Sequence, residues 1–277
     1  MIRQTYFMNH QIPVKADVWS MVAAKLAQAR IRTWIRAPSM NLSWAWDRHP
    51  EWRIPLQPRG SDERMPRYFR LAPDLPEARR AAMDFYTDIA VYLPIQGVVF
   101  DDDVFMTGAE SPAGTPSSDP AAKAAAMRGY LEEIETTVRA WRPGCLFART
   151  VAPAVVERAG LHPDYAQDLD AIMREEDLVV VDAGTNGAAI GSLAAEAVRR
   201  WRAASPSGVP PVMIVLDALD ETTGRWSTAA ELIDAARRAR QAGIAHLGLG
   251  PLVPDRGEWP DRLLEGAAPQ KNGTVKQ

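Results

Sequence analysis

The sequence predicts an α/β fold, a (β/α) barrel of the TIM type, and two observations lead to it. Short apolar runs alternate with amphipathic helical stretches from residue 16 almost to the end, which is typical of a parallel sheet covered by helices. Polar residues follow those runs, on the side where barrels assemble their active sites. The length of 277 residues, 47% of them hydrophobic, suits one such domain.

Six apolar runs are expected to form strands. They lie at residues 31–37, 97–101, 145–150, 178–182, 211–217 and 244–249. Runs that are apolar on both faces would fit a doubly wound open sheet as well as a barrel. The barrel is favoured because polar residues stand at or just past the carboxyl ends of the strands: Asp101, Arg149, Asp182, Asp217 and Asn41.

Six helices are expected between and around these strands. They are predicted at residues 16–30, 77–92, 120–141, 163–176, 187–203 and 228–242. The last has the clearest boundaries, because Ser227 or Thr228 can cap its start and Glu231 falls three residues after Thr228. Gly243 follows its end.

Two connections and the carboxyl end of the chain differ from these elements in composition. Residues 38–73 are rich in Trp, Pro and Arg, and a long aromatic connection in a compact domain is expected to be functional rather than disordered. Residues 108–120, with Ser, Pro and Gly, are expected to form a mobile loop. We therefore expect a single barrel domain over residues 1–265 and a flexible polar tail over 266–277.

Composition argues against several classes of protein. The formal net charge of −3 gives no positive field to attract nucleic acid. No apolar run approaches the roughly 20 residues that cross a bilayer, and the first residues lack the sections of a signal peptide. The single cysteine, Cys145, is expected in the core. Neither a cofactor nor a metal is predicted, since no motif with the required spacing is present.

Three consecutive carboxylates, Asp101, Asp102 and Asp103, directly follow the apolar run at 97–100. Crowded carboxylates raise one another's pKa, so one can keep its proton near neutral pH while a neighbour stays ionised. That combination is what the hydrolysis of a glycosidic bond requires. A solvated acidic turn, a helix cap and a divalent-metal site remain as alternatives.

Aromatic side chains near strand ends strengthen the carbohydrate interpretation. The sequence has nine Trp, and several are placed where a sugar ring could stack on them. Each of them taken alone is more often a core residue than a binding platform. The candidate substrate-binding residues are Asp101, Arg149, Trp34, Trp44, Asp182, Asp217 and Trp226.

In these residues the chain resembles the C-terminal glycoside hydrolase domain of the PgaB family, the poly-β-1,6-N-acetyl-D-glucosamine N-deacetylases of bacterial biofilm export. The similarity is collinear over roughly residues 5–257. It runs through residues 6–17, 68–73, 97–104, 147–149 and 243–248.

The resemblance implies a (β/α) barrel that cleaves partially de-N-acetylated poly-β-1,6-N-acetyl-D-glucosamine. The family motif His-Asp-Asp maps onto Asp101-Asp102-Asp103, which makes Asp102 or Asp103 the catalytic acid. A later family glutamate falls on Glu110, a weaker partner. The family also implies a location in the periplasm or at the outer membrane, with an upstream deacetylase domain or export proteins as partners.

The chain departs from the family at several positions. Asp101 replaces the family histidine, which changes the charge beside the proposed acid. Residues 182–186 and 249–255 replace two family segments that contribute to the sugar-binding wall. The family barrel begins about two strands upstream of the segment at residue 6, so we expect a barrel that is incomplete at its N-terminus, with about six strands.

Three functions follow from this reading of the sequence. The leading one is a glycosidase that acts on a β-1,6-linked amino-sugar polysaccharide by acid-assisted hydrolysis. The second is a glycan-binding or export domain of the same family without catalysis. The third is a metal-dependent hydrolase of another substrate, which chelation would inactivate.

Overall fold

The computed structural model describes residues 4–54, 70–101, 103–113, 118–183, 187–204, 208–220 and 225–250. The chain divides into two compact units. The first comprises Met1–Val151 and Arg158–Leu178, and the second comprises Ala152–Glu157 and Val179–Gln277.

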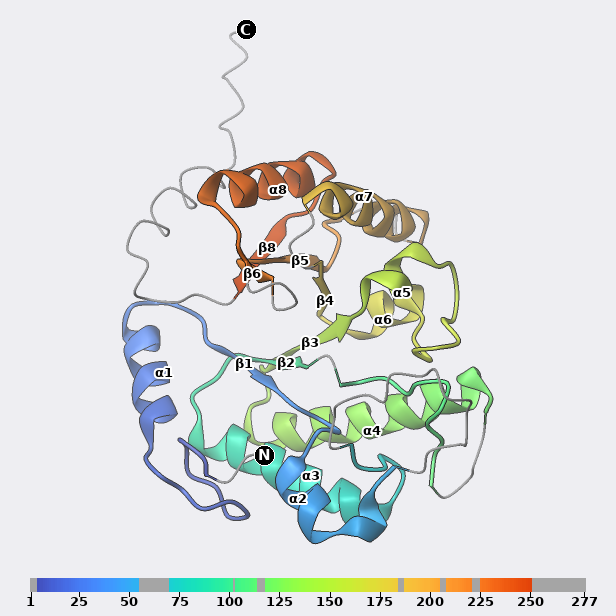
Figure 1. Cartoon of the computed structure of the whole chain (residues 1–277). Coiled ribbons are helices and arrows are strands. Elements are labelled where there is room, and N and C mark those ends of the chain that lie inside the picture. The colour runs from blue at the N-terminus through green and yellow to red at the C-terminus, as the bar shows by residue number, and fades with distance from the viewer. Residues whose placement is uncertain are drawn as a thin grey trace, which may run out of the picture. The chain divides into compact units, whose positions relative to one another are not determined.

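The first unit is built on three parallel strands. Strand β1 (Trp34–Ala37) pairs with β2 (Gly97–Phe100), and β2 pairs with β3 (Leu146–Val151). Helices α3 (Pro76–Tyr92) and α4 (Pro120–Trp141) lie side by side against one face of these strands (Figure 1). The unit also contains α1 (Val18–Gln28), α2 (Ser43–Arg48), the 3-10 helix Pro50–Trp52 and α6 (Leu169–Glu175).

Aromatic side chains form the centre of the core between these strands and α3. Phe100 of β2 stacks on Phe147 of β3, with 5.7 Å between the ring centroids, and meets Tyr86 of α3 edge to face. All three side chains are fully buried. Because successive side chains of a strand point to opposite faces, Val98 and Phe100 face the helices. Gly97, Val99 and Asp101 lie on the opposite face.

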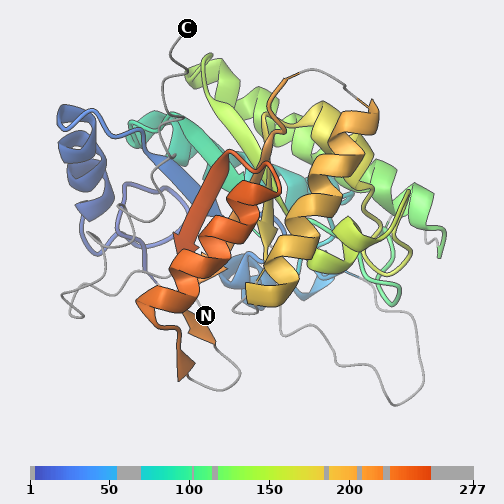
Figure 2. The same ribbon diagram turned by 90° about the horizontal axis from the view of Figure 1, so that it is seen from above.

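The second unit repeats the same pattern. Strand β4 (Leu178–Asp182) pairs in parallel with β5 (Val212–Asp217), and β5 pairs with β8 (His246–Gly250). Helices α7 (Gly187–Ala204) and α8 (Ala229–Gln241) pack against each other (Figure 2). Helix α5 (Pro153–Glu157) packs against α7, and β6 (Leu219–Asp220) pairs antiparallel with β7 (Arg225–Trp226).

All six predicted strands are present, and the structure adds detail that periodicity did not provide. The capping box of α8 is confirmed, since the Thr228 hydroxyl accepts from the Glu231 N–H and the Glu231 carboxylate accepts from the Thr228 N–H. The helix predicted at 163–176 begins only at Leu169, because Asp168 caps it and His162 and Gln167 form a bridge before it. Helix α2, α5, the 3-10 helix and the β6–β7 pair were not predicted.

The burial of side chains confirms one further expectation. Cys145 is buried, as predicted, and burial raises the pKa of its thiol to about 11. Strand β5 is more buried on one face than on the other. Val212, Ile214 and Leu216 are buried, whereas the alternate side chains are only partly buried.

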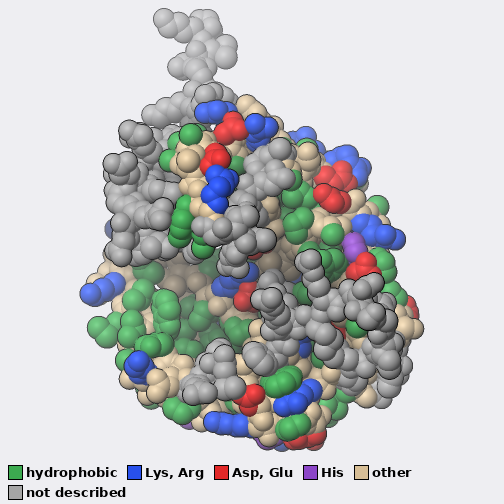
Figure 3. Space-filling view, in the orientation of Figure 1, with side chains coloured by type: hydrophobic (Ala, Val, Ile, Leu, Met, Phe, Trp, Pro, Cys, Tyr) green, Lys and Arg blue, Asp and Glu red, His purple; other side chains and the backbone are tan. Residues whose placement is uncertain are grey.

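Helix α1 is covered less than the other long helices. Ala23 is its one buried residue, and Val18, Trp19 and Met21 are exposed. Figure 3 shows hydrophobic side chains at the surface on the side where α1 lies.

The close approach of Trp34 to Gly97 gives a first prediction. A Cβ atom added to Gly97 would lie 2.2 Å from Cδ2 of the Trp34 ring, so Gly97→Ala must displace the indole from the strand. We expect a loss of about 1–3 kcal/mol in the free energy of unfolding, measured by urea denaturation.

Gly129→Ala is the matched control, because a Cβ there meets no atom within 4 Å and Gly129 lies inside α4. It should stabilise the chain by about 0.5–1 kcal/mol. Equal effects of the two substitutions would contradict the packing of Trp34 on Gly97.

Candidate functional site

Strands β1 and β2 carry an aromatic ring and an ion pair on one face, with the ring at the amino end of β1 and the ion pair at the carboxyl ends of the two strands. Trp34 and Arg36 are two residues apart on β1, and Trp34 lies in register with Gly97 of β2. Nε of Arg36 contacts Oδ1 of Asp101 at 2.5 Å, and their side chains are 46% and 31% exposed. This face therefore offers solvent a partly exposed indole beside a charged pair.

Gly97 permits this arrangement. The missing side chain lets the Trp34 indole lie directly against the backbone of β2. An aromatic ring held flat on a strand in this way can stack on the apolar face of a sugar ring. Trp34 and Asp101, both predicted as substrate-binding residues, thus lie on one face of the same two strands.

Asp103 points into the protein. Its side chain is 1% exposed, and its oxygens accept hydrogen bonds from the backbone N–H groups of Ser39 at 2.9 Å, Met40 at 2.7 Å and Asn41 at 2.6 Å. Those three residues follow β1. The carboxylate therefore ties the segment after β1 to the segment after β2.

The surroundings of Asp103 change its acidity. Burial raises the pKa of this carboxyl to about 6, although the Arg70 guanidinium and the N–H groups of Asn41 and Met40 act in the opposite direction. The nearby charge of Asp101 adds to the increase. Asp103 can accordingly hold its proton under mildly acidic conditions.

A buried ion pair secures the segment that follows Asp103. Nε of Arg70 contacts Oε1 of Glu110 at 2.5 Å, and the two side chains are 2% and 1% exposed. Arg70 also donates to the carbonyl oxygens of Asp103, at 2.8 Å, and of Phe105. The second oxygen of Glu110 accepts from the Thr107 N–H at 2.7 Å. Both carboxylate oxygens of Glu110 are thus engaged within the chain.

Sequence reasoning did not single out Arg70, although it lies within the segment at 68–73 that carries part of the resemblance. A lone arginine in a long polar connection looks like a surface residue. Its burial depends on Glu110, which lies 40 residues further along the chain. The signal available in the sequence was its place inside the matched segment.

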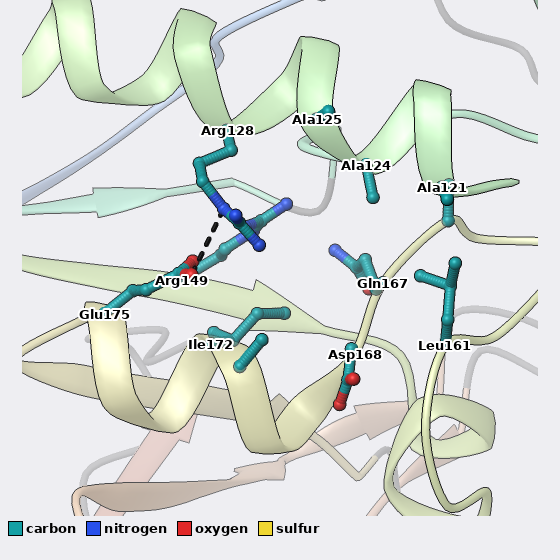
Figure 4. Close-up of a pocket in the computed structure, with 12 residues that line it drawn as sticks. Ala121, Ala124, Ala125, Arg128, Arg149, Leu161, Gln167, Asp168, Ile172 and Glu175 are labelled. Atoms are coloured by element: carbon teal, nitrogen blue, oxygen red, sulfur yellow. Dashed lines mark ion pairs between the residues drawn. The ribbon is translucent and has the colours of Figure 1, made fainter.

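Other predicted site residues of the first unit lie elsewhere, and Asp102 falls outside the described residues. Trp44 is buried in the core on α2. Arg149 is 5% exposed and points into a pocket between α4 and α6 (Figure 4), where its Nη2 donates to the Val104 carbonyl at 3.1 Å.

The predicted residues of the second unit lie near the ends of its strands. Asp182 ends β4 and Asp217 ends β5, so two partly buried carboxylates stand at the carboxyl ends of paired parallel strands. Trp226 belongs to β7 and lies opposite Leu219. This is the placement that a barrel active site uses.

Within the ranges that the structure describes, no three side chains of His, Cys, Asp or Glu are grouped so that they could hold a metal ion. None of the helices in those ranges is long and apolar enough to span a bilayer.

Comparisons with known proteins point to glycoside hydrolases. Residues 1–117 match the model of a family described as hypothetical glycosyl hydrolase family 13. The chain is 28% identical over 138 residues to the poly-β-1,6-N-acetyl-D-glucosamine N-deacetylase of Escherichia coli K12. That match covers 48% of this chain and 20% of the relative, so the chain corresponds to about a fifth of the curated protein.

Solved structures are similar over most of the chain. The PgaB (BpsB) glycoside hydrolase domain from Bordetella bronchiseptica matches with a TM-score of 0.74 and 20% identity, over 90% of this chain and 79% of that one. An α-L-fucosidase from Paenibacillus thiaminolyticus matches with a TM-score of 0.62 and 15% identity, over 95% of this chain and 41% of that one.

These similarities confirm the predicted fold class, an incomplete (β/α) barrel of the TIM type. They also confirm the resemblance that the acidic segment and its neighbours indicated. The chain is a glycoside hydrolase-like domain related to the PgaB hydrolase domain.

Proposed function

We propose that this chain cleaves partially de-N-acetylated poly-β-1,6-N-acetyl-D-glucosamine by acid-assisted hydrolysis of the glycosidic bond. One observation carries the proposal: the Arg36–Asp101 pair lies at the residue that precedes Asp102, on the face of β1 and β2 that also carries the partly exposed Trp34 at the amino end of β1. The ring suits a sugar face, and the carboxylates suit a protonated amino sugar. The names of the relatives supply the polymer.

Asp102 is the residue to which we assign the role of catalytic acid. By resemblance Asp103 and Glu110 are candidates as well. However, three backbone N–H groups occupy the oxygens of Asp103, while Arg70 and Thr107 occupy those of Glu110. These contacts favour a positioning role for both, because they fix the chain on the C-terminal side of Asp102.

The other proposed substrate-binding residues lie at or near strand ends of the second unit and are Asp182, Asp217 and Trp226. Asp182 and Asp217 would bind hydroxyl or ammonium groups of the sugar, since carboxylates accept strongly from charged donors. Trp226 would add an aromatic contact. We place the protein in the periplasm or at the outer membrane, alongside a deacetylase domain or polysaccharide export proteins, on the strength of the relatives' names and the family.

A second function, glycan binding without cleavage, is favoured by one specific observation. Asp101 stands where the family has histidine, and it is paired with Arg36. An aspartate held by a guanidinium cannot donate a proton as an imidazolium does. A domain altered in this way could hold the polymer and leave it intact.

The cleavage proposal predicts a loss of activity on removal of the acid. Asp102→Asn should lower the release of reducing ends from de-N-acetylated polymer by about 10²-fold or more, because an amide cannot donate the proton. Asp84→Asn, on the exposed face of α3, is the control and should match the wild type. A wild type that binds polymer yet releases no reducing ends would select the binding function.

The stacking proposal predicts weaker binding without the indole. Trp34→Ala should weaken polymer binding by about 0.5–1.5 kcal/mol, measured by isothermal titration calorimetry. Trp141→Ala removes an indole that is 59% exposed on α4, and it should leave the affinity unchanged. If both variants bind like the wild type, Trp34 does not contact the sugar.

The positioning role of Asp103 predicts a dependence of stability on pH. Its pKa is raised from 3.8 to about 6 in the folded chain, so the folded state binds this proton more tightly than the unfolded one. The stabilisation is complete below pH 3.8 and is lost as pH rises through about 6, by up to about 3 kcal/mol.

Urea denaturation at pH 4 to 7 measures this dependence, with Asp103→Asn as the comparison. Asp103→Asn should be less stable than the wild type. Its free energy of unfolding should also lack the decrease between pH 3.8 and about 6 that the Asp103 carboxyl contributes in the wild type. Glu176, whose pKa burial raises to about 7, adds a slope of the same sign, so Glu176→Gln is the second comparison. An unchanged slope in Asp103→Asn would contradict the raised pKa.

A further inference from the structure

The chain that follows the proposed acid Asp102, residues 103–110, is buried although it forms no helix or strand. Asp103, Val104, Met106 and Glu110 are each at most 1% exposed. The backbone carbonyl groups of such a segment have no ladder partners and little access to water, so they need donors from side chains. The course of the 103–110 segment therefore depends on the side chains that surround it.

Two buried arginines hold the first carbonyl groups of the 103–110 segment. Arg70 donates to the carbonyl oxygens of Asp103, at 2.8 Å, and of Phe105. The carbonyl of Val104 between them accepts from Nη2 of Arg149 at 3.1 Å. Three successive carbonyl oxygens are thus bound to guanidinium groups.

A buried lysine holds the later part of the segment. Nζ of Lys123 donates to the carbonyl oxygen of Thr107 at 2.9 Å and to that of Gly108 at 3.0 Å. Lys123 is 1% exposed and belongs to α4. Two neighbouring carbonyl groups therefore converge on one ammonium group that comes from outside the segment.

The location of Lys123 is unfavourable for a cation in two respects. Burial removes the hydration of the ammonium group, which is costly. Lys123 also lies in the first turn of α4, where the partial positive charge of a helix N-terminus disfavours a cation. An unbranched apolar side chain would fill the same space without either cost. It could not make the hydrogen bonds to Thr107 and Gly108.

We propose that Lys123 is a positioning residue of the candidate site, which fixes the chain after Asp102 by holding the 103–110 segment at its far end. Arg70 and Lys123 would then restrain the two halves of the segment. Because Lys123 is buried, it acts through the segment and not on the substrate. The inference rests on the cleavage proposed at Asp102 and adds a residue to that site.

Hydrogen exchange of the full chain, followed by mass spectrometry, tests whether Lys123 holds the segment. Lys123→Met keeps an unbranched side chain but removes the donor. We expect the amides of residues 103–110 to exchange at least tenfold faster than in the wild type, because the segment opens locally. Those of β5, in the second unit, should change less than twofold. Lys25→Met, at an exposed lysine on α1, is the matched control and should change neither.

The release of reducing ends from de-N-acetylated polymer distinguishes positioning from a general structural role. In Lys123→Met, kcat should fall at least tenfold while KM changes less than twofold, because the acid is misplaced but the polymer still binds. Lys123→Gln keeps an N–H donor on a shorter side chain. It should lie between Lys123→Met and the wild type in both measurements.

Three results would overturn the proposal. The first is a segment that exchanges in Lys123→Met as it does in the wild type. The second is faster exchange throughout the chain, or loss of the folded state in both variants, which would make Lys123 a general core residue. The third is a loosened segment with an unchanged kcat. A wild type that releases no reducing ends would instead contradict cleavage at Asp102, and the exchange measurement keeps that failure distinguishable from a failure of the contacts of Lys123.

Discussion

The buried carboxylate of Asp103 is the interaction on which the candidate site depends. It accepts hydrogen bonds from three successive backbone N–H groups after β1, although it belongs to the segment after β2. Arg70 and Glu110 then fasten the residues that follow it. These buried contacts hold the carboxyl ends of β1 and β2 together. Arg36 and Asp101, which are partly exposed near those ends, form an ion pair. Burial of a carboxylate is costly, and its donors offset only part of that cost, since the pKa of Asp103 is still raised to about 6.

Much of the fold could be predicted from the sequence because its strands are apolar and its helices amphipathic. Apolar residues recur with a period of two in strands and about 3.6 in helices, and both patterns can be recognised from neighbouring residues alone. The capping box of α8 is likewise formed by neighbouring residues. Helix α2 was not predicted, since it lies in a Trp-rich connection whose burial depends on the rest of the core. The start of α6 was misplaced because the bridge between His162 and Gln167 precedes it.

The sequence pointed to a candidate site at the acidic run but could not predict its geometry. Alternation alone could not show that Asp103 turns inward to backbone donors that lie more than 60 residues earlier in the sequence. Arg149 ends up against α4 and α6, although its position in β3 looked like a substrate contact. Arg149 and Gln167 both donate to the Val104 carbonyl, and this shared contact arises from tertiary packing that no local pattern encodes.

We propose that this domain, related in fold to the PgaB hydrolase domain and with Asp101 where the resemblance implies histidine, cleaves an amino-sugar polymer. Mass spectrometry of a defined, partially de-N-acetylated β-1,6-linked hexasaccharide after incubation with the chain tests this proposal. We expect shorter oligosaccharides from the wild type and intact hexasaccharide from Asp102→Asn. Intact hexasaccharide from a folded wild type that still binds it would contradict the proposal.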